Sequence, residues 1–335
     1  MKNWNSKPKQ RIDYIDRMKG MAIFLVVMGH VYGFALGQAD DVANRVIGSF
    51  HMPLFMFLSG LVACSGAASP FWSLPKLGRK LRGLILPLFF FGFAFTMTWA
   101  KDWSSGMVGL LESPSKNGYW YLMTLAVFYV SLSLFRLNVW RKWYVDVGLA
   151  IVIWGGYLAL WKYTAQTVDY FCLLNCGNFY PFFILGVFTA KYGLLEKVRK
   201  ANWLFSLCVV GYVALFLVEM PLHALDSLNK HIFLPFCMVA VVVMLFMGRH
   251  DKTSPVERVL DYVGKRTLDV YVIHYFFVSQ IHLADIGKAW EASGNALLSF
   301  VLAVFLSAIV TALAIGVGNV LHHGKWIERI VYGKG

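Results

Sequence analysis

Two histidines, at positions 30 and 274, lie inside apolar stretches of helical length, where an ionisable side chain is costly. The first stretch, Asp16–His30, also carries Lys19, and eleven helical steps leave only about 20° of rotation between Lys19 and His30, so the two share a face. These steps rise about 16 Å, which places His30 near the middle of a hydrocarbon core about 30 Å thick when Lys19 lies at its surface. Because histidine is well suited to take a proton from a hydroxyl at neutral pH, His30 and His274 are candidate catalytic residues.

A row of cations precedes the third apolar stretch at intervals of three residues, at Lys76, Arg79 and Arg82. A helix would place this row on one side, where it fits a phosphate clamp and equally fits basic residues flanking a membrane span. The candidate contacts for an acceptor are His51, Tyr119 and Trp120, although the two aromatic residues also fit an interfacial belt. No metal-binding cluster, Gly-rich phosphate loop or Ser-His-Asp signature is present, so we expect no metal.

The composition of the chain predicts that transmembrane helices position these residues. Of 335 residues 58% are hydrophobic and only 15% are charged, and the mean hydropathy is +0.59. The chain is therefore expected to be an all-α, polytopic transmembrane helical bundle forming a single domain, residues 1–335, with a cytoplasmic arm at about 1–16 and no extra extracytoplasmic domain. About ten spans fit, at residues 18–36, 46–65, 82–100, 119–135, 144–161, 178–190, 202–220, 231–248, 267–284 and 296–317.

The distribution of basic residues orients this bundle. With the N-terminus inside, 25 of the 31 Lys and Arg residues fall on the cytoplasmic side. This asymmetry predicts that both termini are cytoplasmic in an inner-membrane protein, and it accounts for the net charge of +13 without a nucleic-acid partner. Cys172 and Cys176 are four residues apart at the outer end of the sixth span, where they fit small buried residues better than an oxidised pair.

Four motifs occur in order along the chain. They are Asp16-x-x-Lys19-x10-His30, the segment from Phe50-His51-Met52-Pro53 to Ser59-Gly60, Arg79-x-x-Arg82, and Thr267-Leu268-x-x-Tyr271-x-x-His274. In these motifs the sequence resembles the acyltransferase 3 family of integral-membrane O-acyltransferases, within it the fucose 4-O-acetylase-like branch. Lysine 19 stands where the family commonly has arginine.

The resemblance implies transfer of an acyl group, usually acetyl from acetyl-CoA, to a hydroxyl of a cell-surface carbohydrate or its lipid-linked precursor. It implies that His30 is the essential histidine, acting as general base or carrying the acyl group, and that Lys19, Arg79 and Arg82 bind the donor, with Lys76 extending their row. The bundle either completes the transfer or passes the acyl group to glycan-assembly proteins. The residues alone leave a proton-coupled transporter or flippase for a glycan or small solute as the alternative.

Overall fold

The computed structural model describes residues 13–64, 74–99, 102–138, 142–164, 168–218, 223–247 and 254–333, so most of the predicted N-terminal arm lies outside the described residues. All regular structure in these ranges is helical, which confirms the all-α class. The residues group into two compact units, one formed by Met1–Ala68 and Leu185–Gly316 and the other by Ser69–Ile184 and Val317–Gly335. Two helices, α7 (Leu173–Tyr192) and α15 (Ala296–His323), contribute to both units.

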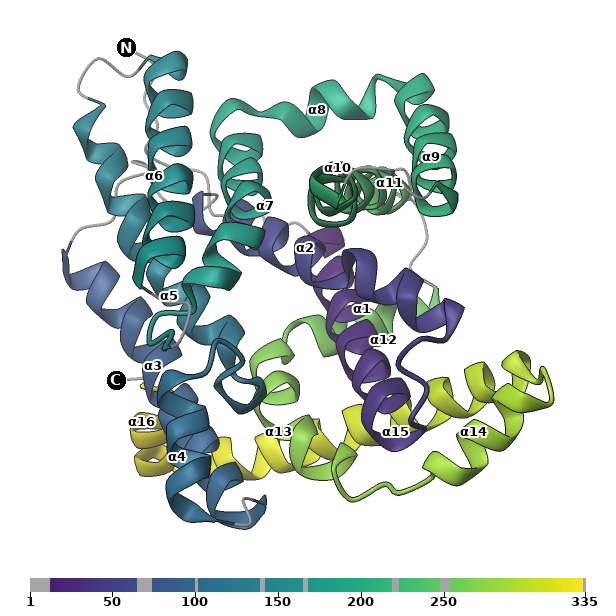
Figure 1. The fold of residues 1–335 in the computed structure, drawn as a ribbon. Helices are drawn as coiled ribbons and strands as arrows, with labels where there is room; N and C mark the ends of the chain where they lie inside the picture. The colour runs from purple at the N-terminus through teal and green to yellow at the C-terminus, as the bar shows by residue number, and fades with distance from the viewer. Residues whose placement is uncertain are drawn as a thin grey trace. The chain divides into compact units, whose positions relative to one another are not determined.

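The first unit contains the two helices at the start of the described chain and most of its second half (Figure 1). Besides its parts of α7 and α15, its elements are α1 (Asp13–His30), the π-helical turn η1 (Val31–Ala35), α2 (Val42–Cys64), α8 (Leu194–Arg199), α9 (Asn202–Leu217), α10 (His223–Leu228), the π-helical turn η4 (Asn229–Phe233), α11 (Leu234–Met247), α12 (Pro255–Gly264), α13 (Thr267–Val278) and α14 (Ala284–Ala292).

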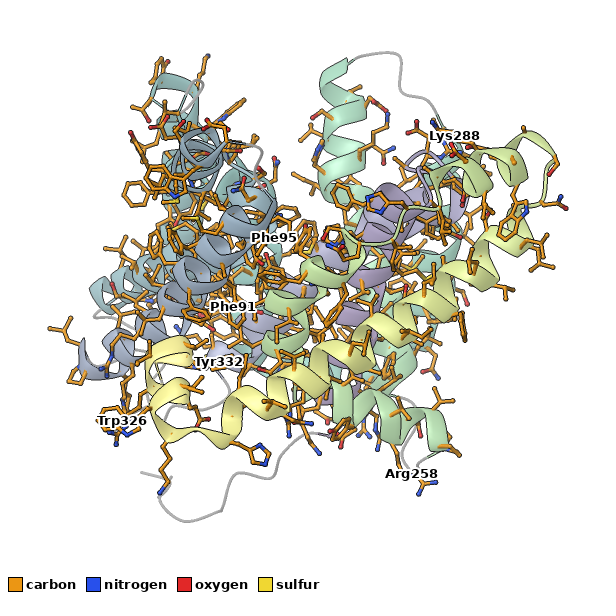
Figure 2. All side chains as sticks on the ribbon, turned by 90° about the horizontal axis from the view of Figure 1, so that it is seen from below. Phe91, Phe95, Arg258, Lys288, Trp326 and Tyr332 are labelled. Atoms are coloured by element: carbon orange, nitrogen blue, oxygen red, sulfur yellow. The ribbon has the colours of Figure 1, made fainter. Side chains whose placement is uncertain are left out.

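The second unit contains α3 (Leu74–Trp99), α4 (Trp103–Glu112), the 3-10 turns η2 (Lys116–Gly118) and η3 (Ser133–Leu137), α5 (Trp120–Leu132), α6 (Trp143–Thr164) and the C-terminal α16 (Lys325–Tyr332). The last helix packs on α3, where the ring of Tyr332 lies 6.0 Å from that of Phe91 (Figure 2).

Seven helical segments among the described residues are long and apolar enough to cross a membrane: Tyr14–Ala35, Val42–Cys64, Leu74–Thr98, Trp143–Thr164, Leu173–Tyr192, Leu225–Met247 and Ala296–His323. Three shorter apolar helices, Trp120–Phe135, Asn202–Leu217 and Thr267–Val278, coincide with other predicted spans. The helix Thr267–Val278 has 12 residues and rises only about 18 Å, less than the hydrocarbon core. Multi-pass membrane character follows, while the count of ten spans and the orientation of the termini stay predictions.

The N-terminal half of α1 packs directly on α12, and glycines make this close approach possible (Figure 1). A Cβ atom at Gly264 would collide with the backbone carbonyl of Asp16, and one at Gly20 would collide with that of Leu260. The start of α12 is fixed by a capping box, in which Ser254 and Glu257 exchange hydrogen bonds with each other's backbone.

Replacing Gly264 with alanine is expected to destabilise the protein by about 1–3 kcal/mol, because the added methyl group must push α12 away from α1. Thermal unfolding in detergent would register this as a midpoint lower by at least about 2 °C. The matched control is Gly48→Ala in α2, where a Cβ meets nothing within 4 Å and the midpoint should stay or rise. Equal midpoints for the two variants would contradict the proposed backbone contact.

Candidate active site

His30 is the last residue of α1, directly before the π-helical turn Val31–Ala35. Within that turn the amide of Leu36 donates to the carbonyl of Val31 at 3.0 Å, a bond spanning five residues, and such turns occur frequently at functional sites. The turn is also bonded to Leu283, the residue directly before α14 (Ala284–Ala292), whose amide donates to the Ala35 carbonyl at 2.9 Å. This hydrogen bond anchors the chain that follows His30.

The side chain of His30 meets His274, which projects from the middle of α13 and is fully buried. Nδ1 of His30 lies 3.0 Å from Nε2 of His274. The two rings are stacked with their centroids 5.1 Å apart, and α1 packs against α13. The structure thus brings together the two histidines that were predicted separately from the sequence, both within the first unit.

The backbone around His274 defines which ring nitrogens carry protons. Nδ1 of His274 lies 2.9 Å from the carbonyl of Val270 and 2.8 Å from that of Tyr271. Since carbonyls only accept hydrogen bonds, Nδ1 of His274 must carry the proton, which leaves Nε2 of the neutral ring as an acceptor. Nδ1–H of His30 then donates to His274, and Nε2 of neutral His30 carries the lone pair. This is the nitrogen a general base needs.

Tyr275 completes the cluster and was missed in the sequence. Its hydroxyl donates to Nε2 of His30 at 2.8 Å, and its ring lies 4.6 Å from that of His30 and 4.4 Å from that of His274. Phe34 stacks on His30 at 5.6 Å and is 62% exposed. The sequence grouped Tyr271 with His274 by helical spacing, and nothing in the spacing indicated that His30 would contact two consecutive residues of α13.

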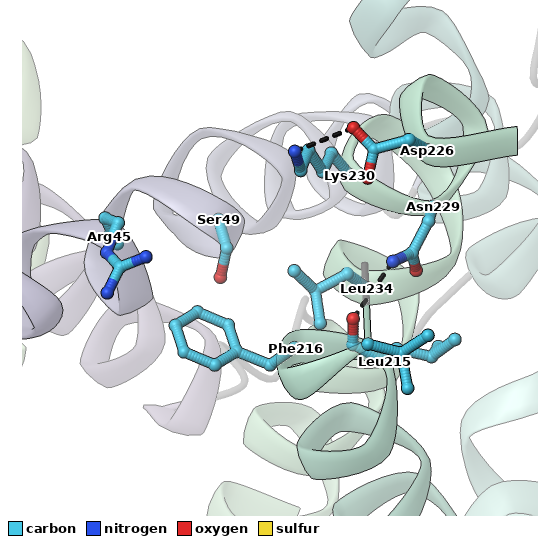
Figure 3. Close-up of a pocket in the computed structure, with 9 residues that line it drawn as sticks. Arg45, Ser49, Leu215, Phe216, Asp226, Asn229, Lys230 and Leu234 are labelled. Carbon is cyan, nitrogen blue, oxygen red and sulfur yellow. Dashed lines mark hydrogen bonds and ion pairs between the residues drawn. The ribbon is translucent and has the colours of Figure 1, made fainter. Parts of the chain in front are cut away.

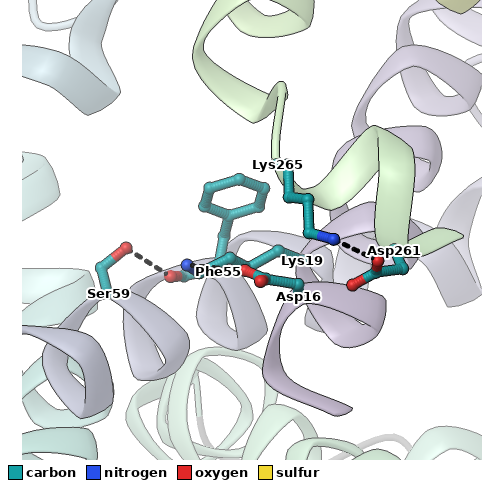
Figure 4. Close-up of polar contacts among 6 residues, drawn as sticks. All are labelled: Asp16, Lys19, Phe55, Ser59, Asp261 and Lys265. Carbon is teal, nitrogen blue, oxygen red and sulfur yellow. Dashed lines mark hydrogen bonds and ion pairs between the residues drawn. The ribbon is translucent and has the colours of Figure 1, made fainter. Parts of the chain in front are cut away.

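Lys19 lies near the other end of α1, as its eleven-residue separation from His30 required. Its ammonium group pairs with Asp16 at 3.6 Å, and 21% of its side chain is exposed. Figure 4 shows this pair beside Phe55 and Ser59 of α2, with the ion pair of Asp261 and Lys265 next to it. Lys19 therefore belongs to a charged cluster at the junction of α1, α2 and α12.

The predicted row Lys76, Arg79 and Arg82 lies in the first turns of α3, in the second unit. All three side chains are exposed, and their spacing in a continuous helix places them along one side. Lys80, between them in sequence, instead reaches toward the ring of Tyr129, 6.0 Å from its centroid. The helical row is thus confirmed as local structure, while its role in donor binding stays a prediction.

The three predicted acceptor contacts have different surroundings. His51 of α2 is half-buried and its Nδ1 lies 2.7 Å from the carbonyl of Ile47. Tyr119 is fully buried near Phe95, and Trp120 stacks on Phe179 at 5.0 Å, so one face of its indole is covered. His51 lies in the first unit and the aromatic pair in the second. Their contact with an acceptor stays a prediction.

Cys172 and Cys176 are buried free thiols, in agreement with the expectation of small buried residues. Burial raises the pKa of Cys172 to about 12, so almost no reactive thiolate forms at neutral pH. Among the described residues no group of three or more His, Cys, Asp or Glu side chains could hold a metal ion.

A pocket of about 320 Å³ lies between α2, α9, η4 and α11 (Figure 3). Arg45 and Ser49 line it from α2, two residues before and after Ile47, which faces Gly29 of α1. Two helical steps turn a side chain by about 200°, so the pocket opens on the side of α2 away from α1. It is therefore separate from the cluster of His30, His274 and Tyr275.

The fold and the cluster together define a multi-pass helical membrane protein with a buried pair of hydrogen-bonded histidines. The chain belongs to the acyltransferase domain family, which it matches over residues 12–317, and it is therefore an acyltransferase.

The chain is 23% identical to the nodulation protein NolL of Mesorhizobium japonicum, over 95% of this chain and 89% of the relative. It is 29% identical to the nodulation protein NolL of Sinorhizobium fredii, over 95% of this chain and 91% of that relative. No solved structure matches the chain. Membership of the family confirms the enzyme class expected from the sequence motifs and favours it over the transporter alternative.

Proposed function

We propose that this protein is an O-acetyltransferase of the cytoplasmic membrane that moves an acetyl group from cytoplasmic acetyl-CoA to a hydroxyl of a cell-surface carbohydrate or its lipid-linked precursor. The single observation that carries the proposal is the bond between His30 Nδ1 and His274 Nε2. With the protons assigned above, this bond places the proton of His30 on Nδ1, so the lone pair on Nε2 is the one that can accept a proton.

In the proposed reaction, Nε2 of His30 takes the proton of the acceptor hydroxyl while the hydroxyl oxygen attacks the thioester carbonyl. The C–O bond forms and the C–S bond breaks, and the proton passes from His30 to the departing thiolate of coenzyme A. The imidazolium that forms in between is stabilised by its Nδ1–H bond to His274. The neutral imidazole of His274 takes the role that the carboxylate has in a Ser-His-Asp triad. The proposed site therefore needs no anion buried at the centre of the membrane.

The same lone pair is also the nucleophile required for an acyl-histidine intermediate. In that route the C–S bond breaks as the acetyl group moves to Nε2 of His30, which gives an acetyl-imidazolium and the free thiolate of coenzyme A. The acceptor hydroxyl then attacks the acetyl group, the C–N bond to His30 breaks, and the hydroxyl proton passes to the thiolate. Rapid acid-free quenching of the enzyme with acetyl-CoA alone, followed by mass spectrometry of the His30 peptide, separates the two routes.

The exposed row Lys76, Arg79 and Arg82 supplies candidate contacts for the phosphates of coenzyme A, because guanidinium groups grip phosphate oxygens two at a time. The positive-inside distribution supports a cytoplasmic position for this row and for Lys19. Lys19 and His30 are eleven residues, or about 16 Å, apart on α1, a separation that the long pantetheine arm of the donor could bridge.

The direct test of the proposal supplies membranes containing the protein with isotopically labelled acetyl-CoA and the host's surface glycan. Label should enter the glycan as an alkali-labile ester, and a deletion strain should lose the corresponding acetyl groups by glycan mass spectrometry. A deletion strain with unchanged surface carbohydrates, together with membranes that transfer no label, would refute the function.

Replacing Arg79 and Arg82 together with glutamine is expected to raise the KM for acetyl-CoA by about 10- to 100-fold, the effect of losing one or two charge-assisted hydrogen bonds. The KM for the acceptor should stay within about twofold. Initial rates at varied donor and acceptor concentrations check this. The matched control is Lys80→Gln on the same helix, which should leave both constants unchanged. Equal effects on donor and acceptor would indicate that the two arginines only flank a membrane span.

A further inference from the structure

The hydroxyl of Tyr275 is hydrogen-bonded to Nε2 of His30, the nitrogen on which the proposed reaction depends. It donates to Nε2 of His30 at 2.8 Å, and this nitrogen has only one lone pair in the plane of the ring. An acceptor hydroxyl can give its proton to His30 only after Tyr275 has released that position. In this structure the lone pair of His30 Nε2 is therefore blocked by Tyr275 and is not accessible to an acceptor hydroxyl.

The surroundings hold Tyr275 in this position. Its side chain is 9% exposed, and its ring contacts both His30 and His274. Phe34 also contacts both rings of this hydrogen-bonded pair, with its own ring 5.6 Å from that of His30 and 6.2 Å from that of Tyr275. A phenol is also a stronger hydrogen-bond donor than water, since its proton is more acidic. A single water molecule is thus a poor competitor for Nε2.

We propose that Tyr275 is a positioning residue that blocks His30 until the carbohydrate acceptor displaces it, and so protects the acyl donor from hydrolysis. The inference rests on the proposed function. The reaction it suppresses is attack of water on the thioester: His30 takes a proton from water, a C–O bond forms, the C–S bond breaks, and the proton passes to the thiolate. The products are acetate and free coenzyme A. A carbohydrate displaces Tyr275 because its other contacts with the enzyme contribute binding energy that water lacks.

The test is Tyr275→Phe, which keeps the ring and removes only the hydroxyl. Release of free coenzyme A from acetyl-CoA without acceptor should rise about tenfold, the factor that one hydrogen bond contributes. Transfer to the acceptor should continue, so the ratio of transfer to hydrolysis falls. The matched control is Tyr32→Phe, two residues after His30, which removes another buried phenolic hydroxyl, one that has no hydrogen-bond partner among the described residues. It should leave the ratio unchanged.

Two further measurements make the outcome decisive. Carbethoxylation of His30 by diethyl pyrocarbonate, followed on its peptide, should be faster in Tyr275→Phe than in the wild type, and it needs no activity. Tyr275→Leu serves in the same assay if the phenylalanine variant does not fold. The double variant with His30→Ala should lose the extra hydrolysis.

The proposal about Tyr275 is overturned if the wild type transfers acetyl groups through His30 while Tyr275→Phe neither hydrolyses acetyl-CoA faster nor exposes His30 to modification. A wild type that transfers no acetyl group at all would refute the proposed function instead.

Discussion

Replacing His30 with alanine is expected to lower acetyl transfer at least about 10³-fold, to the background of membranes lacking the protein. The substitution removes the group that accepts the hydroxyl proton, which alone contributes about 10²–10⁴-fold, and it also removes the nucleophile of the acyl-histidine route. Single-turnover transfer from labelled acetyl-CoA, normalised to the amount of protein in the membrane, measures the loss. Binding of acetyl-CoA should be retained, since the candidate donor contacts lie elsewhere on the chain.

The control for this variant is His231→Ala. His231 is an exposed histidine of η4, whose Nδ1 lies 2.9 Å from the carbonyl of Ser227 and which has no contact with the cluster. Its replacement should leave transfer within about twofold. Normal acetylation by a correctly inserted His30→Ala protein would remove His30 from the chemistry and with it the proposed mechanism.

Replacing His274 with leucine is expected to reduce kcat by about 10²- to 10⁴-fold while the KM for acetyl-CoA changes little. Leucine leaves Nδ1–H of His30 without its acceptor, so the proton can move to Nε2 and the base is lost, as with the wrong tautomer in a Ser-His-Asp triad. Steady-state kinetics at saturating acceptor separate the effect on kcat from one on donor binding.

Glutamine at position 274 distinguishes this role from simple packing. Its side-chain oxygen can accept the proton of His30 Nδ1, so His274→Gln should recover at least about tenfold of the activity that leucine loses. If both variants lose activity equally and both unfold at lower temperature, His274 acts through packing of α13 and not through the proton position on His30.

The sequence alone determined the all-α class and the positions of the ionisable residues within apolar segments. Apolar runs and sparse charge predicted an all-α membrane protein, and the position of His30 inside such a run made it a candidate functional residue. Helical spacing also separated Lys19 from His30, and the ion pair between Lys19 and Asp16 agrees with that separation. These features are local, since they depend on hydropathy and on a fixed rise per residue, and both can be read from consecutive residues.

The lengths of the spans were predicted less accurately from the sequence, because apolar residues continue past the point where a helix ends. The stretch 267–284 was predicted as a full span, whereas its helix ends at Val278 and the chain reaches α14 six residues later. The end of α1 in a π-helical turn had no sequence signal either, since the turn is bonded to Leu283, directly before α14. A contact with a residue far away in the sequence therefore accompanies the second feature.

The site itself was decided by tertiary structure. His30 and His274 are 244 residues apart, and their contact depends on how α13 is rotated against α1, which the sequence of neither helix specifies. That rotation also brings Tyr275, beside His274 in the chain, onto the remaining nitrogen of His30. The sequence therefore predicted a histidine deep within an apolar helix, while packing between distant helices determined which of its nitrogens is available as the proposed base and which side chain covers it.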